Sequence, residues 1–146
     1  MPGIVVGIDG SHHSRRALEW AIREAALRRA PLTVLTVHQV TGYWGGAFVA
    51  YLDDQDLAEQ ARKMAQQETD STLEKIDAGS RPESVTVKAL TGLPADTLLQ
   101  AAADADLLVV GSRGAGGFKR LLLGSVSTQI THHAQCPVVV IPDDDV

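Results

Sequence analysis

A segment rich in glycine and basic residues lies between a predicted strand and a predicted helix. The apolar run at 107–110 (LLVV) is typical of a strand buried on both faces, and a helical pattern starts near Gly124. The segment between them contains the following glycines and cationic side chains: Gly111, Gly114, Gly116, Gly117, Arg113, Lys119 and Arg120. A phosphate needs several N–H groups converging on it with no side chain in the way, and glycine permits both. The segment is therefore predicted to hold the phosphates of a nucleotide.

The start of the following helix adds further groups that suit an anion. Gly124 and Ser125 stand where backbone N–H groups lack intrahelical acceptors, and the Ser125 hydroxyl is another donor. The segment is neither a Walker A sequence nor a GxGxxG dinucleotide fingerprint. A simpler alternative is a flexible turn whose cations, Arg113, Lys119 and Arg120, face water. The local sequence leaves both interpretations open.

Asp9 is a second candidate binding residue. It follows the apolar run 4–8 (IVVGI), which predicts another buried strand. Its carboxylate can accept hydrogen bonds from ribose hydroxyls or help to hold Mg²⁺. If the strands that end at Asp9 and Gly111 are neighbours in a parallel sheet, both residues line one crevice at the carboxyl edge. The alternative role for Asp9 is to cap the helix that follows.

The elements that must position these residues alternate along the chain. Strands are predicted over residues 4–8, 32–37, 85–89, 107–110 and 138–141, and helices over residues 14–29, 55–78, from 94 and from 124. The strand at 85–89 alternates apolar and polar residues, which is typical of an exposed edge. Strands that alternate with helices predict one α/β domain, spanning 1–146, with a parallel sheet covered on both faces.

Two other groups of residues suggest functions but have simpler explanations. The long segment 39–54 carries several aromatics, which suits either a lid over a base or a surface loop. The histidine pairs at 12–13 and 132–133 lie adjacent in sequence, so the members of each pair point apart on a helix and chelate one ion poorly. Cys136 has no second thiol, and a core position explains it best. No structural metal site is expected.

Composition narrows the class of protein. The chain has 146 residues, 45% of them hydrophobic and 21% charged, which are ordinary values for a soluble globular domain. A net charge of −5 argues against general nucleic-acid binding, which usually needs a basic face. No apolar run is long enough to span a membrane, and the first residues do not resemble a signal peptide. We therefore expect a cytoplasmic protein that binds neither membranes nor nucleic acid.

Three stretches of the sequence resemble one family. Gly111-x-x-Gly114, nine further residues and then Gly124-Ser125 resemble the G-2x-G-9x-G-(S/T) signature of the universal stress protein family, in its ATP-binding branch. The opening VVGIDGS (5–11) and the closing AQCPVVVIP (134–142) are similar to that family's first strand with its acidic turn and to its last strand. The resemblance covers essentially the whole chain.

The resemblance implies a fold and a set of contacts. The fold would be a flavodoxin-like (Rossmann-like) three-layer sandwich of five parallel strands in the order 3-2-1-4-5, with a homodimer formed through the C-terminal strand. Asp9, with the backbone of Gly7 and Ile8, would face the adenosine, and the backbone of Val37 would pair with the adenine edge. The residues that would lie along the triphosphate and ribose are Gly111, Ser112, Arg113, Gly114, Gly124, Ser125 and Val126.

The expected function is to bind ATP, with or without Mg²⁺, in a stress-response or regulatory role. No general base, nucleophile or dedicated metal cage is evident in the sequence, so little or no turnover is expected and the protein is not expected to be an enzyme, although weak ATPase activity stays open. Three alternatives remain: a slow nucleotide hydrolase or adenylyl-transfer enzyme, a binder of cyclic AMP or AMP, and an interaction module without a nucleotide. The glycines at 111, 114 and 124 disfavour the last of these.

Overall fold

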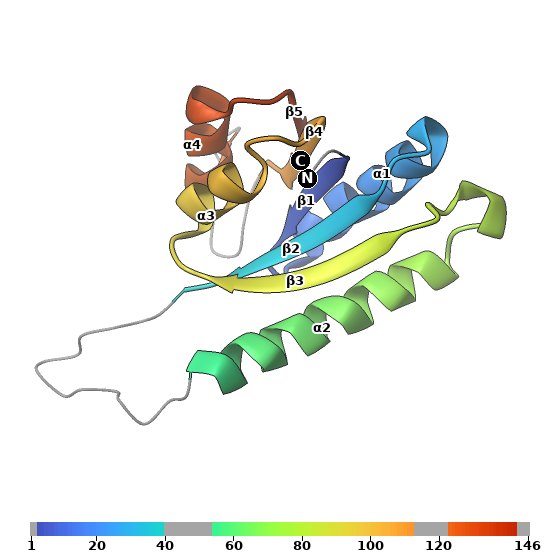
Figure 1. Ribbon diagram of the computed structural model, residues 1–146, viewed down its shortest axis with the longest axis horizontal. Coiled ribbons are helices and arrows are strands. Elements are labelled where there is room, and N and C mark those ends of the chain that lie inside the picture. Colours follow the sequence, from blue (N-terminus) through green and yellow to red (C-terminus); the bar gives the residue numbers. More distant parts are fainter. Residues whose placement is uncertain (1–2, 40–53, 113–122, 143–146) are drawn as a thin grey trace, which may run out of the picture.

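The computed structural model describes residues 3–39, 54–112 and 123–142, and all five predicted strands are present (Figure 1). The elements in chain order are β1 (Ile4–Ile8), α1 (His12–Arg28), β2 (Leu32–His38), α2 (Asp54–Glu74), the 3₁₀ turn η1 (Ala78–Ser80), β3 (Val85–Thr91), α3 (Pro94–Ala101), β4 (Leu107–Gly111), α4 (Ser125–His133) and β5 (Val138–Ile141). Most of the predicted segment 39–54, together with Arg113, Gly114, Lys119 and Arg120, lies outside the described residues.

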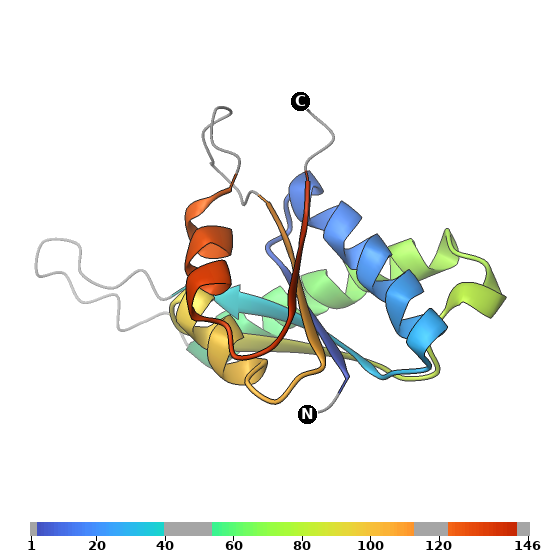
Figure 2. The ribbon, with the colours of Figure 1, turned by 90° about the horizontal axis from the view of Figure 1, so that it is seen from above.

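The five strands form one sheet, all parallel, in the order β3-β2-β1-β4-β5, as predicted. Figure 2 shows the sheet between two helical layers, with α1 and α2 on one face and α3 and α4 on the other. β1 is central, and every one of its residues is buried because helices cover both faces. The order confirms that β1 and β4 are neighbours.

Two apolar clusters follow from the period-two alternation of strand side chains. Ile4 and Val6 of β1 pack with α1 and α2, whereas Val5 packs with α3 and α4.

At the edges of the sheet burial is lower. On β3, Val87 is buried while Thr86 and Lys88 are exposed, so the prediction of an exposed edge strand is confirmed.

α2 ends four residues earlier than the sequence pattern predicts. Ile76 continues the apolar face of the helix, but the N–H groups of Lys75 and Ile76 bond to the carbonyls of Thr72 and Leu73, three residues back. This tighter turn ends the helix at Glu74 and still buries Ile76 in the core. A pattern of apolar positions does not distinguish such a turn from one more turn of α-helix.

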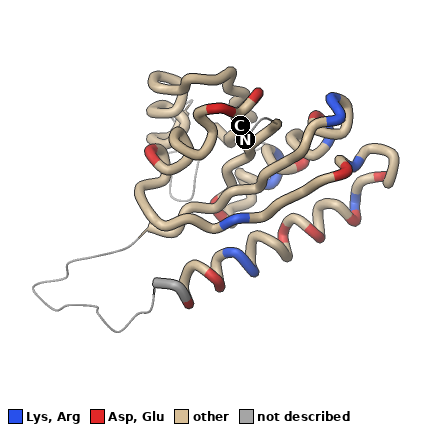
Figure 3. Tube along the Cα trace, viewed as in Figure 1, with Lys and Arg blue, Asp and Glu red and all other residues tan. Residues whose placement is uncertain are grey.

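Charged residues on the helix exteriors pair within their own helices. Figure 3 shows acidic and basic positions interspersed along α2. Pairs of this kind include Arg23–Glu19, Arg28–Glu24 and Arg62–Glu59, with N–O distances of 3.0, 2.8 and 2.8 Å. These partly exposed pairs contribute little stability. In the part of the chain that the structure describes, no helix is both long and apolar enough to cross a bilayer.

Gly7 of β1 makes room for α3. A Cβ built on Gly7 would lie 3.0 Å from both Cδ1 and Cδ2 of Leu98, which is itself buried. The missing side chain at this position is therefore explained by helix packing, because α3 sits close against the strand.

A bulky residue at position 7 should destabilise the fold. We expect Gly7→Val to lower the free energy of unfolding by about 1–3 kcal/mol, because it overpacks the contact with Leu98. Urea denaturation measures the change. Gly79→Val is the matched control, since a Cβ at Gly79 meets nothing within 4 Å. Equal stability of the two variants would contradict the packing role of Gly7.

Candidate nucleotide-binding crevice

The two central strands separate toward their carboxyl ends. β1 is paired with β4 as far as Val6 and Val109, but β1 continues to pair with β2 up to Ile8. β4 likewise pairs with β5 up to Gly111. After β1 the chain continues into α1 on one face of the sheet, and after β4 it continues into α4 on the other face. The gap between β1 and β4 is therefore the topological switch point, where open α/β sheets bind their ligands.

The carbonyl group of Ser112 holds the end of β4 to the start of α4. It accepts a hydrogen bond from the N–H of Gly124 (2.6 Å) and another from the hydroxyl of Ser127 (3.0 Å). The N–H of Ser112 donates to the carbonyl of Ile141, which ties the same residue to β5. Ser112 and Ser127 are both buried. The glycine-rich segment therefore leaves and re-enters the fold at one fixed point.

The N-terminus of α4 opens at that point. Gly124 is the N-cap residue in an extended conformation, and as a glycine it has no side chain that could cap the helix. The first N–H groups of a helix have no intrahelical acceptor and carry a partial positive charge. Ser125 is exposed, whereas the side chain of Val126 packs against the α3–α4 cluster. Ser125 can thus offer a hydroxyl and an N–H to an anion, and Val126 only its N–H.

Asp9 lies in the turn between β1 and α1. Its Oδ1 accepts hydrogen bonds from the N–H of Ser11, at 2.9 Å, and from the Ser11 hydroxyl. Gly10 has a φ of +82°, a conformation that favours glycine. The N-cap of α1 is Ser11, so the alternative role of Asp9 as the N-cap is wrong. The carboxylate instead shapes an exposed turn beside the crevice.

The remaining predicted contacts are backbone groups. The side chain of Ile8 is buried under α1 and α2, and that of Val37 packs on the opposite face of the sheet. Both residues stand at the carboxyl ends of their strands, at the same edge as Asp9. Arg113 and Gly114 lie outside the described residues, so their predicted contacts with phosphate stay predictions.

Known proteins share both the sequence and this architecture. The profile of the universal stress protein family matches residues 2–142. A universal stress protein of Mycolicibacterium smegmatis is 37% identical over 98% of this chain, which covers 49% of that relative. The chain belongs to the universal stress protein family. It spans about half the length of the curated relatives it matches.

Two solved universal stress proteins have the same fold. The protein UspA of Lactobacillus plantarum superposes with a TM-score of 0.72 at 27% identity, covering 94% of this chain and 95% of the other. Another universal stress protein, solved in complex with cAMP, gives a TM-score of 0.64 at 26% identity, covering 95% and 94%. The topology of the described residues is therefore that of the family.

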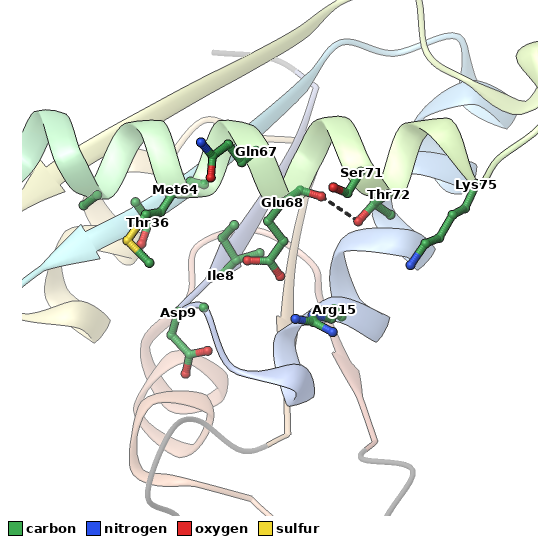
Figure 4. A pocket seen from close by; sticks show the side chains of 13 residues that line it. Ile8, Asp9, Arg15, Thr36, Met64, Gln67, Glu68, Ser71, Thr72 and Lys75 are labelled. Carbon is green, nitrogen blue, oxygen red and sulfur yellow. Dashed lines mark hydrogen bonds between the residues drawn. The ribbon is translucent and has the colours of Figure 1, made fainter.

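In this universal stress protein a groove extends from Asp9 under α2 (Figure 4). Its volume is about 510 Å³, and polar side chains from α1, β2 and α2 line it, among them Arg15, Thr36, Glu68 and Lys75. Figure 4 shows Glu68 pointing from α2 into the groove, between Asp9 and Arg15. Glu68 is not among the binding residues predicted from the sequence. The available signal was its position: it follows Ala61 and Ala65 on the inward face of the helix, where an apolar residue is expected.

The surroundings of Glu68 disfavour its charge. Burial raises the pKa of the Glu68 carboxyl above its ordinary value, the cation of Arg15 opposes this, and the negative charge of Asp9 adds to it. One carboxylate oxygen, Oε1, is buried and accepts no hydrogen bond among residues 3–39, 54–112 and 123–142. Across the same residues, no three His, Cys, Asp or Glu side chains come together as a metal site.

Removing this charge should stabilise the protein at neutral pH. Because the pKa of Glu68 is raised on folding, its contribution to stability is present in acid and is lost as the pH rises through the folded-state pKa. We expect Glu68→Gln to melt above the wild type at pH 7, with the gap closing as the pH falls through the raised pKa toward the ordinary glutamate value. Thermal melts from pH 4 to 8 test this, with Glu74→Gln, at an exposed position, as control. A gap independent of pH would contradict the effect.

Proposed function

We propose that this chain belongs to the ATP-binding branch of the family and holds an adenine nucleotide in the crevice between β1, β4 and α4. The observation that carries the proposal is the double hydrogen bond to the Ser112 carbonyl, which joins the end of β4 to the N-terminus of α4, beside β1. A relative 26% identical to this chain was solved with cAMP, which supports an adenine nucleotide as ligand.

The charges in the crevice favour one orientation of the nucleotide. The phosphates lie at the positive N-terminus of α4, with Ser112, Ser125, Val126 and the glycine-rich segment around them. Asp9 repels phosphate unless a Mg²⁺ ion lies between them, so the adenosine occupies its side of the crevice. The backbones of Gly7, Ile8 and Val37 then face the nucleoside.

We propose a regulatory, stress-response role in the cytoplasm, in which the nucleotide is held with little or no hydrolysis. A cyclic adenine nucleotide is the second candidate ligand, because of the cAMP complex of the relative. Mass spectrometry of the nucleotide released on denaturing the purified protein distinguishes ATP from AMP and cyclic AMP, and an intact triphosphate argues against turnover.

A carboxylate at the N-terminus of α4 should displace the phosphates. We expect Ser125→Glu to weaken ATP binding by at least about tenfold, because its charge occupies the anion position. The same charge should leave α4 as stable as before or more so, by about 0.3–1 kcal/mol, because it complements the helix dipole. Calorimetric titration with ATP and a thermal melt measure the two effects.

Ser125→Gln is the matched control for Ser125→Glu, because a glutamine side chain has nearly the same shape as glutamate but carries no charge. It should keep most of the affinity. Wild-type affinity for ATP in Ser125→Glu would overturn the placement of phosphate at α4, and absence of ATP binding by the wild type would overturn the proposed function.

We also propose that two copies associate through the edge of β5, as the resemblance implies. The carbonyls of Pro137 and Ile141 accept hydrogen bonds from β4, so in this parallel pair the backbones of residues 137, 139 and 141 face β4. The N–H and C=O groups of Val138 and Val140 consequently point outward from the edge. A partner strand would use these groups.

Proline at position 140 should prevent that pairing without touching β4. We expect Val140→Pro to shift the protein to a monomer, because it removes an outward N–H and leaves the β4–β5 hydrogen bonds intact. Sedimentation velocity measures the mass, and Val140→Thr serves as control for the lost side chain. A dimer that persists in Val140→Pro would place the interface elsewhere.

A further inference from the structure

The groove under α2 contains a hydrogen-bond acceptor that the fold itself does not use. Oε1 of Glu68 is buried, yet no donor in the described part of the chain reaches it. A buried acceptor left in this state destabilises the fold, because its lost hydration is not replaced. Thr69, the next residue on α2, is also buried, but its hydroxyl donates to the carbonyl of Ala65 and is satisfied. Among the described residues, Glu68 is therefore a groove-lining side chain with a buried polar atom that has no hydrogen-bond partner.

Charged groups face Glu68 from each side of the groove. Asp9 approaches from the end of β1, Arg15 from the first turns of α1, and Lys75 stands further along the groove just beyond α2. Arg15 attracts the carboxylate electrostatically but gives no hydrogen bond to Oε1. The Glu68 side chain lines the groove, and Figure 4 shows its carboxylate pointing toward the side where Asp9 borders the crevice.

The sign of these charges restricts which part of a ligand fits beside Glu68. Two carboxylates, Asp9 and Glu68, lie near one another and repel phosphate groups. A neutral donor, such as a hydroxyl or an amine, meets no such repulsion and satisfies the unused oxygen. In a nucleotide those donors are the ribose hydroxyls and the exocyclic amine of the base.

We propose that Glu68 is a specificity residue that accepts a hydrogen bond from a neutral donor of the bound nucleoside, either a ribose hydroxyl or the adenine amine. This inference rests on the proposed function, because it takes the phosphates to lie at α4. It assigns selectivity to α2, on the opposite side of Asp9 from the glycine-rich segment. A site that hydrogen-bonds a donor discriminates against analogues that lack it, because the acceptor is then left unpaired.

The test compares four nucleotides on the wild type and on Glu68→Ala. ATP is the reference, 2′-deoxy-ATP and 3′-deoxy-ATP each lack one hydroxyl, and inosine triphosphate lacks the exocyclic amine. We expect the wild type to bind one of the three analogues about tenfold more weakly than ATP, and Glu68→Ala to bind that analogue and ATP alike. The analogue affected identifies the donor. Calorimetric titration gives the dissociation constants.

Two further variants keep the result interpretable. Glu68→Gln retains an acceptor oxygen in a side chain of the same length, so it should keep part of the discrimination between ATP and the analogue. It replaces Glu68→Ala in the comparison if Glu68→Ala folds poorly. Glu74→Ala, on the exposed end of α2, should discriminate as the wild type does.

The outcomes separate this inference from the function on which it rests. If the wild type and Glu68→Ala bind ATP and show the same ratios for all three analogues, the role of Glu68 is wrong and the proposed function stands. If the wild type binds none of the four nucleotides, the proposed function fails, and the inference fails with it.

Discussion

The candidate site depends on the carbonyl oxygen of Ser112, which accepts hydrogen bonds from Gly124 and from the hydroxyl of Ser127. Both serines are buried, so water does not compete for these bonds. Closing a loop costs conformational entropy. Here the hydrogen bonds from Gly124 and Ser127, at the start of α4, offset that cost. The end of β4 and the N-terminus of α4 are therefore held together as one unit beside β1.

Opposite charges at the two sides of the crevice favour one orientation of a bound ligand. The N-terminus of α4 is positive, whereas Asp9 and Glu68 place negative charge at the end of β1 and under α2. An elongated ligand with an anionic end and a neutral, donor-rich end fits this field in one orientation.

The fold was predictable because its central strands are short apolar runs that alternate with amphipathic helices, a pattern typical of parallel α/β sheets. The early end of α2 was not, since Ile76 keeps the apolar period while the backbone tightens into a turn. Ser127 was missed because a serine inside a helix gives no sign in sequence that its hydroxyl reaches back to Ser112. Glu68 was missed for a similar reason, as burial depends on how α2 lies over β1.

The two sides of the site also separate two kinds of selectivity. Backbone N–H groups at a helix start recognise one phosphate group and do not count how many follow it, so in the proposed complex discrimination between mono- and triphosphates would fall to other groups near α4. Discrimination among nucleosides would fall to Asp9, the strand ends and Glu68. Because these two sets of residues belong to different elements, substitutions on the two sides should change affinity independently and their free energies should add. Such additivity would let related chains vary one selectivity without disturbing the other.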